Sequence, residues 1–207
     1  IDGLTNAFMG SGENITGERI NIGRFIPDHF NLSITNNWIE QCSGTFSYAG
    51  FANGTAGLNK NGQADNIVFT VQAVNSANNP TLNYDGGFAK LEAGTITPTA
   101  YDTFASANAP GTLSSTLSSI NFNTSGNSSV TLSNIFYQFN TLSAPLNLNI
   151  NIQATDSDSV SGSASSNTVE NRLGRMRLID AYGPETSDLE IQLATDYHDG
   201  SSWVLNI

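Results

Sequence analysis

The sequence predicts an all-β protein, on the evidence of its composition, its alternating runs and its turn residues. Of its 207 residues, 38% are hydrophobic and only 12% are charged, with many asparagines, serines, threonines and glycines in their place. This composition is too apolar for a disordered chain, yet it is poor in the leucine, glutamate, lysine and arginine of helical proteins. Apolar and polar residues alternate in several short runs, which is the two-residue period of a half-buried strand.

The clearest expected strand is the run LNLNINIQA at residues 146–154. Its leucine, isoleucine and alanine side chains fall on one face, and its asparagine and glutamine side chains fall on the other, which excludes a helix. Residues 93–129 remain open between a long exposed loop and a short helix, because Leu113 and Leu117 have helical spacing among helix-disfavouring serines. Shorter strand-like runs occupy residues 30–35, 45–51, 67–73, 88–91 and 130–139.

Turn residues between these runs predict an antiparallel, immunoglobulin-like β-sandwich over residues 20–168. Residues 1–19 are expected to be a linker or an edge strand. The polar stretch at 155–168 is interpreted as the boundary to a second module. Residues 169–207 are expected to form three strands, either the start of a second β-sandwich or strands that pack on the first. Within them, Asp199-Gly200 indicates a hairpin.

Charge and cysteine content narrow the range of functions. The net charge of -11 leaves too few bases to neutralise many phosphates, so nucleic-acid binding and attraction to anionic lipid are not expected. The single cysteine, Cys42, excludes an internal disulfide and is interpreted as a small buried residue. No apolar run is long enough to span a bilayer, so no membrane insertion is expected. The opening without methionine suggests a piece of a longer protein.

One metal site is a candidate. Asp156, Asp158 and Glu170 flank the polar stretch, and carboxylates in an interdomain loop can converge on a calcium ion. The competing interpretation, a solvated acidic turn, is favoured, and the spacing after Asp156 does not match an EF-hand loop. No other cofactor is expected.

The aromatic residues offer a second candidate site. Trp38 and Trp203 could present a sugar-stacking platform on a sheet face, although such residues more often pack in the core. His29 and His198 lack the spacing of a zinc site and are interpreted as structural. No nucleophile motif lies at a strand-to-helix turn, so an enzyme is not expected.

The three arginines near the C-terminus are a third feature. Arg172, Arg175 and Arg177 lie within six positions of one another in a chain that has only seven lysines and arginines. We expect them to pair with the surplus carboxylates across strands rather than to bind an anion.

Five stretches carry a resemblance to a known family: IGRFIPDHFNLSIT (22–35), CSGTFSYAGF (42–51), FTVQAVNSANNPTLNYDGGFAKL (69–91), GRMRLIDAYGPE (174–185) and LEIQLATDYHDGSSWVLN (189–206). In this order they resemble the MshQ-like bacterial surface proteins of the mannose-sensitive haemagglutinin pilus locus, with their C-terminal region of the DUF6701 type. The resemblance implies an extracellular, non-catalytic structural or interaction module that serves adhesion or pilus assembly. Its expected partners are other pilus or surface proteins, with glycans as a further class. The alternative is a calcium-assisted carbohydrate-binding module.

Overall fold

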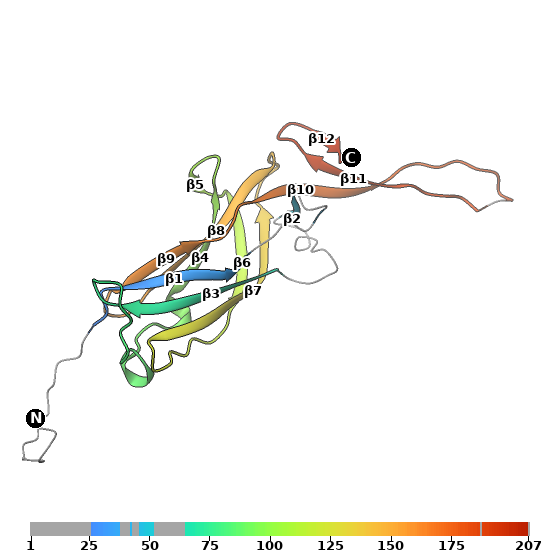
Figure 1. Ribbon diagram of the computed structural model, residues 1–207. Coiled ribbons are helices and arrows are strands. Elements are labelled where there is room, and N and C mark those ends of the chain that lie inside the picture. Colours follow the sequence, from blue (N-terminus) through green and yellow to red (C-terminus); the bar gives the residue numbers. More distant parts are fainter. Residues whose placement is uncertain (1–25, 38–41, 43–45, 52–64, 187, 207) are drawn as a thin grey trace, which may run out of the picture.

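The computed structural model describes residues 26–37, 42, 46–51, 65–186 and 188–206, and it is an all-β structure (Figure 1). Two short 3-10 helices, η3 (Gly86–Phe88) and η4 (Ala93–Thr95), interrupt the strands, and no helix among the described residues is long and apolar enough to cross a membrane. The strands are β1 (His29–Asn36), β2 (Ser47–Phe51), β3 (Asp65–Val74), β4 (Ile96–Asp102), β5 (Ala107–Asn108), β6 (Gly111–Leu117), β7 (Asn127–Phe139), β8 (Leu146–Thr155), β9 (Ser161–Ser165), β10 (Val169–Leu178), β11 (Leu193–His198) and β12 (Trp203–Leu205).

All these strands belong to one hydrogen-bonded network. Its main path runs β1-β3-β7-β2-β10-β8-β4-β5, while β6 pairs with β7, β9 with β8, β11 with β10 and β12 with β11. The expectation of a purely antiparallel sheet needs a correction, because β2 runs parallel to both of its neighbours, β7 and β10. The sheet is therefore mixed, and β2 joins its two halves.

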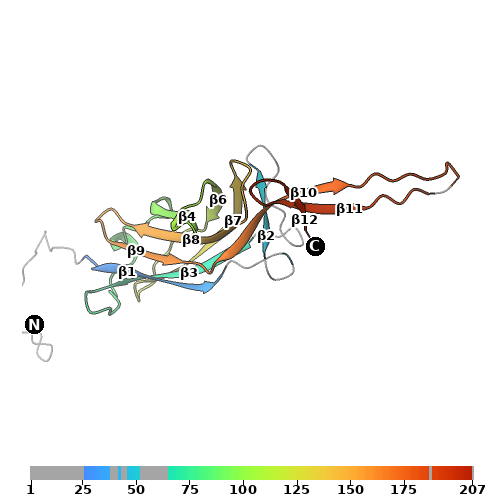
Figure 2. The same cartoon turned by 90° about the horizontal axis from the view of Figure 1, so that it is seen from above.

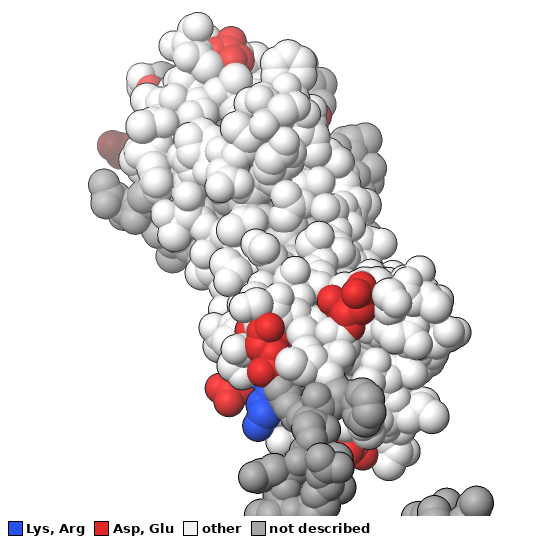
Figure 3. All heavy atoms as spheres, turned by 90° about the vertical axis from the view of Figure 1, so that its left-hand side faces the viewer, with Lys and Arg blue, Asp and Glu red and all other residues white. Residues whose placement is uncertain are grey.

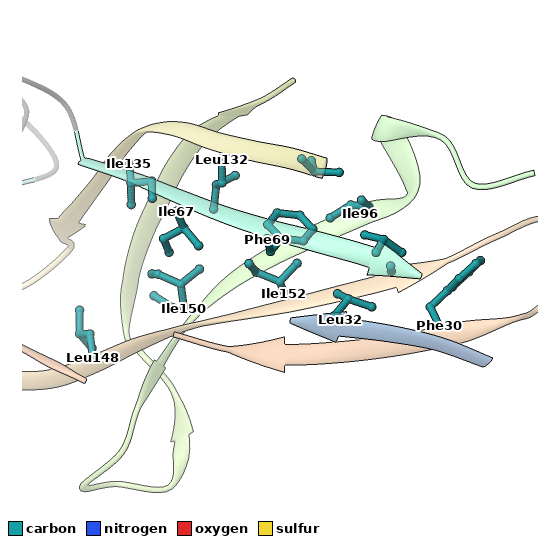
Figure 4. Packing of buried hydrophobic residues seen from close by; sticks show 14 of the residues in the cluster. Phe30, Leu32, Ile67, Phe69, Ile96, Leu132, Ile135, Leu148, Ile150 and Ile152 are labelled. Carbon is teal, nitrogen blue, oxygen red and sulfur yellow. The ribbon is translucent and has the colours of Figure 1, made fainter. Parts of the chain in front are cut away.

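The two halves face each other across one hydrophobic core (Figure 4). Strands β1, β3, β6 and β7 lie in one layer, and β4, β8 and β9 lie in the other. Phe69 of β3 meets Ile150 and Ile152 of β8 at the centre, and all three are fully buried. Every second residue of β8 points into this core, as the alternation in LNLNINIQA predicts.

Two polar stretches form strands that the sequence does not predict. Residues 93–129, expected as a loop or a short helix, contain β4, β5 and β6. In β6, Leu113 and Leu117 pack on the core, and the backbone of β6 pairs with β7 in an antiparallel ladder. The stretch 155–168, interpreted as a domain boundary, contains β9, which pairs with β8 over five positions. The chain therefore stays within the sheet through residues 161–165.

The C-terminal strands extend away from the core as an arm (Figures 1 and 2). We call the segment from 174 to 198 the arm; it consists of the second half of β10, the connecting chain and β11. Strand β12 adds to the base of the arm by pairing with β11. The predicted hairpin between them is present, and Asp199 accepts hydrogen bonds from the amides of Ser201 and Ser202.

We predict that Gly162→Ala destabilises the protein, because β9 lies so close to β1 that a Cβ there has no room. An added Cβ would overlap the carbonyl oxygen of Phe30 and lie 2.8 Å from its carbonyl carbon. Backbone cannot rotate away as a side chain can, so we expect a loss of about 1–3 kcal/mol in the free energy of unfolding, measured in urea.

The matched control is Gly94→Ala, whose added Cβ would meet nothing within 4 Å. It should change the free energy of unfolding by no more than about 0.5 kcal/mol. Equal stability of the two variants would contradict the close approach of β9 to β1.

Candidate functional site

The first half of strand β10 pairs with strands of the core, and its second half pairs with β11 of the arm. The middle of β10 is therefore the point where core and arm connect. The first half is held in the core sheet, where Asn171 pairs with both Leu146 of β8 and Ser47 of β2. From Gly174 onward the same strand pairs instead with β11, beginning with Tyr197. A Cβ at Gly174 would overlap the ring of Tyr48, so a glycine is needed where the strand crosses from one sheet to the other.

Arg172 connects the two sheets at this crossing. Its Nε donates to Glu170 at 2.6 Å, and its Nη1 donates to the side-chain oxygen of Asn206 at 2.6 Å. Its guanidinium also lies over the rings of Phe46 and Tyr197, with centroids 4.0 and 4.8 Å away. Because Phe46 is a buried residue beside β2 while Tyr197 belongs to β11, one side chain joins core and arm.

Asp196 forms the second connection, within the arm itself. Arg175 and Arg177 both reach Oδ2 of this carboxylate at 3.0 Å, and only 3% of its side chain is exposed. The hydrogen bond from Arg177, with that from Arg175, holds the pKa of Asp196 below its ordinary value of 3.8. The expected pairing of the arginines with carboxylates is confirmed, across strands for Arg175 and Arg177 and along β10 for Arg172.

The three carboxylates proposed as a calcium site do not come together. Glu170 pairs in register with Asn147, near the start of β8, whereas Asp156 follows the last residue of that strand. Positions 147 and 156 of an extended strand are roughly 30 Å apart. The carboxylate of Glu170 forms an ion pair with Arg172. The described residues contain no group of three or more His, Cys, Asp or Glu that could hold a metal ion.

Asp156 instead anchors a turn. Its Oδ2 accepts a 2.7 Å hydrogen bond from the hydroxyl of Tyr84, and its Oδ1 accepts from the amides of Asp158 and Val160. The Tyr84 hydroxyl in turn accepts from the amides of Lys90 and Leu91. Burial, and then the hydrogen bond to Asp156, raise the pKa of Tyr84 well above its usual value. These contacts account for the buried carboxylate without an ion.

Of the two tryptophans considered for a sugar-stacking platform, the structure describes only Trp203. Trp203 lies in β12, edge-on to His198, and the guanidinium of Arg175 lies 4.4 Å from its ring centroid. Its ring is therefore engaged at the base of the arm. Trp38 lies outside the described residues. His29 contacts Asp28 and Asn78 at the start of β1.

Comparison with known proteins gives a family but no characterised relative. A family model described as "DUF6701, third domain" matches residues 2–176, and one described as "DUF6701, fourth domain" matches residues 172–207. The two matches meet in β10, at the crossing described above. No curated protein and no solved structure matches the chain.

We predict that Asp196→Asn weakens the arm in a pH-dependent way. Because folding lowers the pKa of Asp196 below 3.8, the stabilisation by this carboxylate is present above that pH and is lost as the pH falls through the lower, folded-state value. Near neutral pH we expect the amides of β10 and β11 in the arm to exchange hydrogen several-fold faster in the variant than in the unmodified protein.

The ratio of the two exchange rates should approach one well below pH 3.8. The control is Asp180→Asn, which removes an exposed carboxylate elsewhere in the arm and should leave the ratio near one at every pH. A ratio for Asp196→Asn that does not change with pH would rule out the proposed role of its charge.

Proposed function

The chain belongs to the DUF6701 family, and we propose that it is a non-catalytic structural and interaction module of an exported bacterial surface protein, displayed with or near a pilus. The observation that carries the proposal is the crossing of β10 from the core sheet into the arm. The resemblance to MshQ-like surface proteins supports the link to a pilus.

A shared strand is a stiff connection between domains. Most domains in one chain are joined by exposed linkers, which let them move relative to each other. Here the family's third and fourth domains meet within ten residues of continuous strand, and Arg172 adds contacts on both sides. Such a junction suits a protein that must hold a binding element at a fixed distance and direction from a cell surface.

The surface composition supports an exposed location in water. In Figure 3 the face opposite the arm consists mostly of uncharged residues, with several acidic groups and few basic ones. The strands turn asparagine, serine and threonine outward, which keeps a low-charge sheet protein soluble.

We further propose that the core, predicted from the sequence as residues 20–168, is an immunoglobulin-like sandwich. Two facing layers with one shared core support this description. The parallel pairings of β2 with β7 and β10 distinguish it from a simple antiparallel sandwich.

The test is binding of the purified chain to assembled pili from a bacterium that carries a mannose-sensitive haemagglutinin locus, measured by biolayer interferometry. We expect saturable binding. The matched variant is Gly174→Val, which places a branched side chain against Tyr48 and should redirect the arm. It should bind at least about tenfold more weakly, a loss of ~1.4 kcal/mol.

Two outcomes would contradict the proposal. The first is the absence of binding to pili at micromolar concentration of the chain. The second is equal binding by Gly174→Val, provided that its circular dichroism shows an intact fold, because the fixed direction of the arm would then have no role.

A further inference from the structure

One face of the arm is bare. The register of β10 with β11 places Leu178 opposite Leu193 and Met176 opposite Thr195, so their side chains share a face. Met176, Leu178 and Leu193 are 63%, 67% and 61% exposed. Large apolar side chains in a sheet ordinarily pack against a second layer, and here none of the described residues supplies one.

The opposite face of the arm is covered by its own side chains. Arg175 and Arg177 lie there, opposite Asp196 and Ala194 in the register. Their ion pairs bury Asp196, and Ala194 beside it is also buried. The two faces therefore differ in kind: ion pairs lie over one of them, and among the described residues nothing packs on Met176, Leu178 and Leu193 of the other. Ile179, which follows Arg177 on the ion-paired face, is 38% exposed.

Further exposed apolar residues follow toward the tip of the arm. Leu189 and Ile191 alternate in the sequence with the same two-residue period as Leu193, and both are exposed. A Cβ at Gly183 would lie 3.0 Å from Cδ1 of Leu189, so the two halves of the arm stay adjacent there. We define the arm apolar face as Met176, Leu178 and Leu193 of the paired strands together with Tyr182, Leu189 and Ile191 of the connecting chain, all of them exposed.

The size of this face marks it as an interaction surface. Six large exposed side chains amount to an apolar patch on the order of several hundred Å², which is the range in which patches on soluble proteins are functional. An isolated two-stranded ribbon is also marginally stable in water, so covering one face would stabilise the arm as well.

The acidic residues of the arm indicate which kind of partner its apolar face would bind. The segment 178–193 contains Asp180, Glu185, Asp188 and Glu190 and no lysine or arginine. All four carboxylates are exposed. A second copy of the chain would bring the same four charges, and a total charge of -11, against this surface, so self-association is opposed by like-charge repulsion.

We propose that the arm apolar face docks the apolar face of a β-sheet in another protein, and that lysines or arginines rim that sheet. A flat ribbon fits a second sheet at the usual spacing of about 10 Å between layers. The basic rim pairs with the acidic arm and selects this partner over a second copy. This docking surface rests on the interaction role proposed above for the chain.

The test uses a fluorescent peptide of alternating leucine and lysine, which presents an apolar strand face with basic neighbours. Fluorescence anisotropy in 0.15 M salt should show saturable binding to the intact chain. Peptides of alternating leucine and glutamate, or of alternating serine and lysine, should bind at least about tenfold more weakly, since each lacks one of the two matched features.

The variant Leu178→Ser with Leu193→Ser should weaken binding of the leucine–lysine peptide at least about tenfold. Its matched control is Leu82→Ser with Leu142→Ser, which removes two leucines of similar exposure outside the arm and should leave binding unchanged. The variant Asp180→Asn with Glu190→Gln should weaken binding of the same peptide, and more so at low salt than at high salt.

Several results would overturn the inference. Equal binding of the leucine–lysine and leucine–glutamate peptides would contradict the proposal that basic residues rim the partner's sheet. The inference would also fail if the intact chain dimerises in sedimentation equilibrium and the variant Leu178→Ser with Leu193→Ser does not. The partner on this face would then be a second copy of the chain.

If the chain binds pili and this variant binds them equally well, the proposed function stands and the inference fails. If the chain binds the peptide through this face but does not bind pili, the inference stands and the pilus role fails.

Discussion

The structure depends on how the core holds the first half of β10. Val169, Asn171 and Leu173 are buried between β8 and β2, and this sets the direction in which the strand leaves the core. The two-residue period then assigns every later side chain to a face, with Arg175 and Arg177 on one side and Met176 and Leu178 on the other. A shift of the strand by one residue would exchange these faces. The covered and bare surfaces of the arm are therefore both consequences of packing in the core.

The scarce basic residues are concentrated where this strand crosses between sheets. Three of the seven lysines and arginines lie in β10, in a chain with 18 acidic residues. A buried carboxylate such as Asp196 is costly without a cation, and two guanidiniums surround it. Arg172 adds contacts with two aromatic rings and an asparagine, which a lysine could not reproduce with the same geometry. The segment 178–193 at the tip of the arm contains no lysine or arginine, and its four carboxylates are exposed.

Local patterns predict the local parts of the fold well. The alternation in residues 146–154 predicts β8 with both of its faces, and Asp199-Gly200 predicts the hairpin between β11 and β12, where Gly200 has a φ of 106°. Non-local relations leave weaker signals. The parallel pairings of β2, and the distance between Asp156 and Glu170, depend on which strands become neighbours. The bare face was partly visible in the alternation of Leu189, Ile191 and Leu193, but the alternation indicates an apolar face and does not tell whether a partner layer covers it.

We infer that core and arm form one rigid unit through β10. The most direct test is a distance distribution between spin labels at Ser163→Cys in β9 and Leu193→Cys in β11, with Cys42→Ser to remove the native thiol. Both labelled positions are exposed, so the labels should not disturb packing. We predict one narrow distribution in solution, which Arg172→Ala broadens by removing the contacts to Phe46, Tyr197 and Asn206. A broad or multiple distribution in the protein with Arg172 in place would contradict it, because the arm would then move as an independent body.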